Sequence, residues 1–91
     1  METIHVLFVF GTRPEAVKLC PLILRMRERR EFRVRVCVTA QHREMLDAML
    51  ERFGVEPDDD LDVMAPDQPL NQLAARILER LDAVLARRRP D

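Results

Sequence analysis

The fold of this chain is decided by residues 4–18, which read IHVLFVFGTRPEAVK. Residues 4–10 are apolar except for His5, a pattern typical of a strand buried on both faces of a parallel sheet. Gly11 lets the backbone turn sharply, and Pro14 suits the first helical position because its missing N–H is not needed there. The stretch therefore predicts a buried strand that passes through a tight turn into a helix.

The same junction is suited to binding an anion such as phosphate. The free N–H groups of a first helical turn carry the positive end of the helix dipole, while Glu15 complements that dipole in a structural role. Arg13 offers a planar fork, and Lys18, the only lysine among 15 basic residues, can lean back toward the helix start. Neither a Walker loop nor a G-x-G-x-x-G motif is present. From these residues alone, a phosphate site and a plain turn with two solvated cations are equally open.

Composition indicates a small globular unit and argues against several classes of partner. The 91 residues are 47% hydrophobic, and 15 basic and 16 acidic side chains give a net charge of −1. That balance argues against nucleic-acid binding and against attraction to anionic membranes. No stretch is long enough to span a membrane and no signal peptide is evident, so we expect a cytoplasmic protein.

Cys20 and Cys37 lack metal-like spacing and are expected to be buried, and we expect no metal or cofactor.

Further along the chain, strands and helices alternate. Residues 33–39 alternate in period two, with Val34, Val36 and Val38 on one face. Pro21 should kink or break the first helix, and Gly54 should close the second. The acidic run at residues 58–60 is expected to be a solvated loop. The predicted elements are a strand at 4–10, a helix at 14–29, a strand at 33–39, a helix at 41–53, a strand at 61–64 and a helix at 69–88.

This order is βαβαβα, which predicts an α/β, Rossmann-like parallel sheet with right-handed crossovers. Sheets of this kind bind ligands at the switch in strand order, between the first strand and a neighbour reached only later. No later strand follows the last predicted helix. We therefore expect residues 1–91 to be the first part of a nucleotide-binding domain.

Two motifs, with flanking residues, resemble a known family. Residues 10–18 read FGTRPEAVK, and residues 39–47 read TAQHREMLD. Together with Pro21, residues 68–70 and the closing Pro90-Asp91, they look like the non-hydrolysing UDP-N-acetylglucosamine 2-epimerases. The resemblance covers essentially the whole chain.

The resemblance implies two Rossmann-like domains in a GT-B arrangement, of which this chain would be the N-terminal part. The implied reaction interconverts UDP-N-acetylglucosamine and UDP-N-acetylmannosamine: the C2 proton is removed, UDP is expelled to leave a glycal, and UDP is added back with the opposite configuration at C2. Gly11, Arg13 and Lys18 would contact UDP, where fixed cations stabilise the charge of the leaving group. The resemblance further implies a cytoplasmic, homodimeric enzyme that serves cell-envelope polysaccharide synthesis.

No catalytic acid or base carries over, because the family's proton-transfer residues lie beyond the matched region. The 91-residue chain alone is therefore expected to be inactive. Many bacterial members also have a regulatory pocket, and Gln41, His42 and Gln68 match residues in it. Glu44 and Asp67 replace an expected glutamine and arginine and would repel a diphosphate, which argues against this regulation.

Two alternatives stay open from the sequence. One is a free-standing module that binds a nucleotide or a partner chain through the surface left by the missing strand. The other is a hydrolysing epimerase or another GT-B sugar-nucleotide enzyme.

Overall fold

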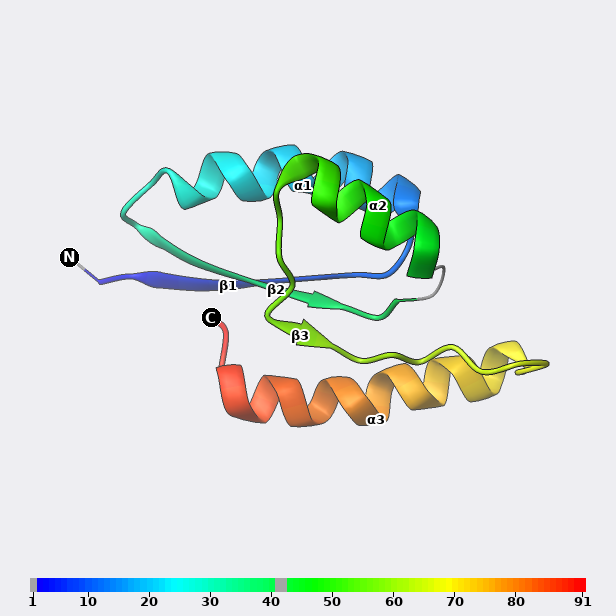
Figure 1. Cartoon of the computed structure of the whole chain (residues 1–91). Coiled ribbons are helices and arrows are strands. Elements are labelled where there is room, and N and C mark those ends of the chain that lie inside the picture. Colours follow the sequence, from blue (N-terminus) through cyan, green and yellow to red (C-terminus); the bar gives the residue numbers. More distant parts are fainter. Residues whose placement is uncertain (1, 41–42) are drawn as a thin grey trace.

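The computed structural model describes residues 2–40 and 43–91. Its strands form one parallel sheet in the order β1-β2-β3. Helices α1 and α2 lie on one side of this sheet and α3 on the other (Figure 1). The arrangement confirms the predicted α/β, Rossmann-like class. The elements are β1 (Ile4–Phe10), α1 (Arg13–Arg27), β2 (Phe32–Val38), α2 (Arg43–Phe53), β3 (Asp59–Asp60) and α3 (Leu70–Arg88).

Each face of the sheet has its own hydrophobic core. The first core joins Phe10, Val36 and Val38 to α1 and α2, chiefly through Ile23 and Leu46. The second core joins the other face to α3 and is built by Cys37, Leu61, Val63 and Val84, with Leu73, Ile77 and Leu81 packed against it. The period-two pattern of β2 therefore sorts its side chains between two helix layers, as predicted. Both cysteines are buried free thiols, also as predicted.

β1 is less buried than its apolar sequence predicts. Ile4 is 47% exposed and Val9 is 37% exposed, although Phe10 is buried. The physical reason is that β1 pairs with β2 along one edge only, among the residues that the structure describes. Both faces still contribute to a core, since Phe8 packs against the first and Leu7 against the second, so the expected two-sided packing is present but the expected full burial is not.

The acidic run is not a solvated loop. Asp59 and Asp60 form β3, opposite Cys37 and Val38, whereas the strand was predicted at residues 61–64. The Asp58 carboxylate accepts a hydrogen bond from the N–H of Val36 at 2.7 Å. The Asp59 side chain is only 7% exposed and is paired with guanidinium groups of α3. Three acidic residues thus tie the sheet edge to the surrounding elements.

Helix α1 runs without a break through Pro21, so of the two expected outcomes the break is wrong and the kink stays a prediction. A proline at this position frees the carbonyl of residue 17, one turn earlier. Val17 and Pro21 are both exposed, so water can solvate that carbonyl. Gly54 closes α2 as predicted, with φ of +70° and with the N–H of Val55 donating to the carbonyl of Leu50 at 2.9 Å.

Candidate functional site

The Gly11–Lys18 junction lies at the carboxyl end of β1, as the sequence predicts. Gly11 is buried, and Thr12 is extended, with φ of −127° and ψ of 161°, before α1 begins at Arg13. The Thr12 hydroxyl donates to the Glu15 carboxylate at 2.8 Å and does not cap the helix. Glu15 therefore has the structural role expected of it, and the N–H groups of the first turn stay free of a side-chain cap.

Arg13 is the first residue of α1 and is exposed, so it belongs to the helix and not to the preceding turn. Its side chain lines an open groove against α2. The other lining residues are Met45, Ala48, Met49 and Arg52. Arg13 and Arg52 thus give this groove two cations, beside the N-terminus of α1.

Lys18 is also exposed. It lies five residues after Arg13, about 7.5 Å along the helix axis and about 140° around it. Ala16, Cys20 and Ile23 mark the buried side of α1, and Lys18 projects from the opposite side. The two cations therefore share one end of α1 but not one face. They can meet only on a ligand placed beyond the N-terminus of the helix.

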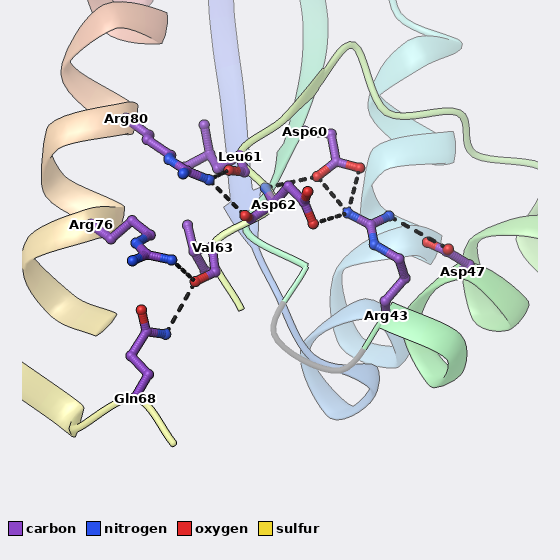
Figure 2. Close-up of polar contacts among 9 residues, drawn as sticks. All are labelled: Arg43, Asp47, Asp60, Leu61, Asp62, Val63, Gln68, Arg76 and Arg80. Carbon is purple, nitrogen blue, oxygen red and sulfur yellow. Dashed lines mark hydrogen bonds and ion pairs between the residues drawn. The ribbon is translucent and has the colours of Figure 1, made fainter. Parts of the chain in front are cut away.

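A second polar cluster lies at the carboxyl ends of β2 and β3, around Arg43 (Figure 2). Its Nη2 donates to both oxygens of Asp60 at 2.9 Å and to Asp62 at 3.0 Å. Asp47, one turn further along α2, lies 3.6 Å from Nη1. The hydrogen bonds that Arg43 donates to Asp60 and Asp62 raise the pKa of Arg43 further above its ordinary value, so this cation is fixed at every physiological pH.

The segment after β3, residues 61–68, is held from the other side by α3, and we call it the edge loop. Arg80 donates to the carbonyl oxygens of Leu61 and Asp62. The carbonyl of Val63 accepts from Gln68 at 3.1 Å and from Arg76 at 3.4 Å (Figure 2). α2 therefore binds the carboxylates before and within the edge loop, and α3 binds its carbonyls. These arginines could not be predicted from the sequence, because their partners lie 13 to 19 residues away and no local pattern indicates the pairing.

Among the described residues, three of the four non-glycine residues with positive φ lie at the same end of the sheet; the fourth, Arg89, ends α3. Ala40, Asp62 and Asp67 have φ of 62°, 47° and 55°, a left-handed conformation that residues with a Cβ rarely adopt. The Oγ1 atom of Thr39 and the Oε1 atom of Gln68 are buried and have no partner among the described residues. Strained backbone and unpaired buried oxygens are both features that concentrate at ligand sites.

The predicted regulatory residues are only partly placed. Gln68 lies in the edge loop, and its side chain is half-buried. Gln41 and His42 lie outside the described residues. Glu44 and Asp67, the two acids that argued against diphosphate binding, are exposed. In residues 2–40 and 43–91, no group of three or more His, Cys, Asp or Glu side chains is placed to hold a metal ion.

Comparison with known proteins places these features in a family. The family model described as UDP-N-acetylglucosamine 2-epimerase matches residues 24–91. The chain belongs to the UDP-N-acetylglucosamine 2-epimerase family. Two proteins named UDP-N-acetylglucosamine 2-epimerase, from Yersinia pestis and Escherichia coli K12, are 55% and 52% identical to it over 86 residues. These matches cover 94% of this chain and 23% of each relative, so the chain spans about a quarter of the family members it matches.

Solved structures agree with this family membership. The Neisseria meningitidis UDP-GlcNAc 2-epimerase, determined with UDP-GlcNAc bound, is 45% identical with a TM-score of 0.88, covering 97% of this chain and 24% of its own. An S. aureus protein determined with UDP is 37% identical with a TM-score of 0.92, covering 98% and 23%. Within the part of this chain that the structure describes, no helix is long and apolar enough to cross a membrane.

Proposed function

We propose that this chain is the UDP-contacting N-terminal part of an enzyme that interconverts UDP-N-acetylglucosamine and UDP-N-acetylmannosamine. The observation that carries the proposal is the uncapped start of α1, which presents free N–H groups and Arg13 at the carboxyl end of β1, in a chain of the epimerase family. Ligands of open parallel sheets bind at this edge. Relatives determined with UDP-GlcNAc and with UDP support a nucleotide-sugar ligand.

In the proposed reaction, UDP leaves after the sugar loses its C2 proton; UDP is then added back at C1 of the glycal, and C2 regains a proton with the opposite configuration. The diphosphate gains negative charge as its bond to the sugar breaks. Arg13 and Lys18 hold fixed positive charge on two sides of the helix N-terminus, where the helix dipole adds to it. Because Gly11 has no side chain, the diphosphate can approach the backbone closely. These groups stabilise the leaving group and perform no proton transfer.

The proton-transfer residues are proposed to lie in the part of the enzyme that this chain does not represent. A base must be positioned beside the weakly acidic C2 proton. Asp60 and Asp62, at the carboxyl edge of the sheet, already accept hydrogen bonds from Arg43 and are not free to act as bases. We accordingly assign no catalytic residue to this chain. We place residues 1–91 in the first of two Rossmann-like domains of a cytoplasmic, homodimeric enzyme.

Regulation by a second nucleotide sugar is proposed to be absent or weakened in this protein. Gln68, one of the matching residues, already donates to the carbonyl of Val63. Glu44 and Asp67 add two exposed negative charges to the neighbouring surface. A diphosphate would be repelled by both.

The test replaces the homologous region of the Escherichia coli relative with this chain and measures conversion of UDP-N-acetylglucosamine. We expect an active hybrid in which Arg13→Ala lowers kcat/KM by about 100-fold or more, as loss of one charge-stabilising donor does elsewhere. Arg30→Ala, which removes an exposed cation in the turn between α1 and β2, is the matched control and should leave kcat/KM unchanged. A folded but inactive hybrid, or equal losses in the two variants, would contradict the proposal.

A further inference from the structure

Residues 12–15 read TRPE, which has the sequence of a helix capping box but does not form one. In that motif, the hydroxyl of the N-cap residue accepts a hydrogen bond from the N–H of the third helical residue. Thr12 occupies the N-cap position of α1, and its extended backbone is typical of a capping residue. Its hydroxyl instead donates to the Glu15 carboxylate at 2.8 Å. The residues and the backbone of a cap are therefore present, while the cap itself is absent.

The first turn of α1 has few free main-chain donors, and a capping Thr12 would occupy one of them. Pro14 has no N–H, and the N–H of Ala16 donates to the carbonyl of Thr12 at 3.0 Å. Among the described residues, no acceptor is paired with the N–H groups of Arg13 and Glu15. A capping hydroxyl reaches the second or third helical residue, so at this helix it can take only the N–H of Glu15. The position of the Thr12 hydroxyl therefore decides whether one of these two donors is free.

By charge alone, Glu15 is an unfavourable neighbour for an anion. A carboxylate in the first turn of a helix stabilises the helix dipole, but it repels an anion that binds at the same end. The side chain of Glu15 is exposed, and its hydrogen-bond partner is Thr12. Because a carboxylate can only accept, the Thr12 hydroxyl uses its single proton on Glu15 and is turned toward it. This contact gives the carboxylate a role that its charge does not explain.

We propose that Glu15 is a positioning residue for the diphosphate site. Its carboxylate holds the Thr12 hydroxyl away from the main chain, so that the N–H of Glu15 stays available to the ligand. In the absence of the carboxylate, the hydroxyl turns back and caps the helix, and a diphosphate must then displace it. We call this choice of partner the Thr12–Glu15 switch. The ligand in this inference rests on the proposed function, whereas the switch itself needs no ligand.

Two substitutions of Glu15 separate the hydrogen bond from the charge. Glu15→Gln removes the charge but keeps an oxygen that accepts from Thr12, whereas Glu15→Ala removes both. UDP binding to the 91-residue chain is measured by isothermal titration calorimetry. We expect Glu15→Ala to bind UDP about 5-fold more weakly than Glu15→Gln, the factor that corresponds to a typical N-cap bond. If only the charge of Glu15 mattered, the two variants would have equal affinities.

A second substitution and a matched control identify the cause of this loss. Thr12→Val keeps the shape of the side chain and removes the hydroxyl. Combined with Glu15→Ala, it should restore most of the lost affinity, because no hydroxyl is left to cap the helix. Glu51 is an exposed carboxylate on α2, away from the start of α1. Glu51→Ala and Glu51→Gln should therefore bind UDP equally.

Thermal unfolding without nucleotide tests the Thr12–Glu15 switch directly. Thr12→Val should lower Tm by about 4 °C or more in the Glu15→Ala background, where the hydroxyl caps the helix, and by less in the chain that keeps Glu15. Equal Tm shifts in the two backgrounds would overturn the switch. Equal UDP affinity of Glu15→Ala and Glu15→Gln, in chains that bind UDP, would overturn the positioning role alone. Absence of UDP binding by the wild type and by Glu15→Gln would overturn the proposed function, and the positioning role with it.

Discussion

Asp59 should be the acidic residue whose loss destabilises this fold most. Its carboxylate is 7% exposed, and it accepts from Nε of Arg88 at 2.9 Å and from Nη2 of Arg87. These contacts tie the last turn of α3 to the short strand β3. Breaking a buried ion pair costs about 3–5 kcal/mol. Because both guanidinium groups keep some contact with water, we expect Asp59→Asn to cost about 2–3 kcal/mol.

The assay is thermal and urea unfolding followed by circular dichroism. For a domain of this size, a loss of about 2 kcal/mol lowers Tm by at least about 8 °C. Asp82→Asn is the matched control, since Asp82 is exposed on the same helix. A change below about 0.5 kcal/mol in Asp59→Asn, equal to that in Asp82→Asn, would refute the reasoning.

The ion pairs of Asp59 with Arg87 and Arg88 also predict that stability falls at low pH. The hydrogen bond from Arg88, helped by Arg87, lowers the pKa of Asp59 below its ordinary value. A carboxyl group whose pKa is lower in the folded state contributes its stability above its unfolded pKa and loses it as pH falls through its folded pKa. The difference in free energy of unfolding between the wild type and Asp59→Asn should therefore have its full value at pH 6. It should shrink as the pH falls below the ordinary aspartate pKa of about 3.9. A difference that is unchanged at pH 2.5 would contradict the role of the carboxylate.

Three further results are expected. Leu46→Ala should lower the free energy of unfolding by about 2–5 kcal/mol in urea, because Leu46 is fully buried in the first core. Cys37 should resist Ellman's reagent at pH 8 until the chain unfolds, since burial, followed by Asp59 and Asp60, raises its pKa to about 11. Arg89→Gly should raise stability by about 0.5–1 kcal/mol in the same urea assay, because Arg89 is exposed and ends α3 with φ of 49°, which strains a residue with a Cβ.

Local sequence signals were enough for most of the architecture. The apolar run at residues 4–10 and the alternation at 33–39 placed β1 and β2, and Gly54 placed the end of α2. Each signal acts through residues close together in the chain, as periodicity and capping do. The Gly11 turn was found for the same reason.

The errors arose where distant residues decide the structure. β3 formed at Asp59 and Asp60 because Arg43 binds Asp60 from α2 and Arg87 and Arg88 bind Asp59 from α3, 17 to 29 residues away in sequence. Read locally, three aspartates indicate a solvated loop. The arginines that hold the edge loop were missed for the same reason. Burial of β1 was overestimated because a strand's own residues do not show whether both of its edges are paired.

Isothermal titration calorimetry tests whether the Gly11–Lys18 junction holds the diphosphate of UDP. UDP and uridine are titrated into the 91-residue chain and into its Arg13→Ala and Arg30→Ala variants. We expect UDP to bind and uridine not to bind, and we expect Arg13→Ala to weaken UDP binding roughly 10-fold or more, as loss of a charged hydrogen bond does. Arg30→Ala should bind as the wild type does. Equal affinity for UDP and uridine, or no UDP binding by the folded chain, would contradict the claim.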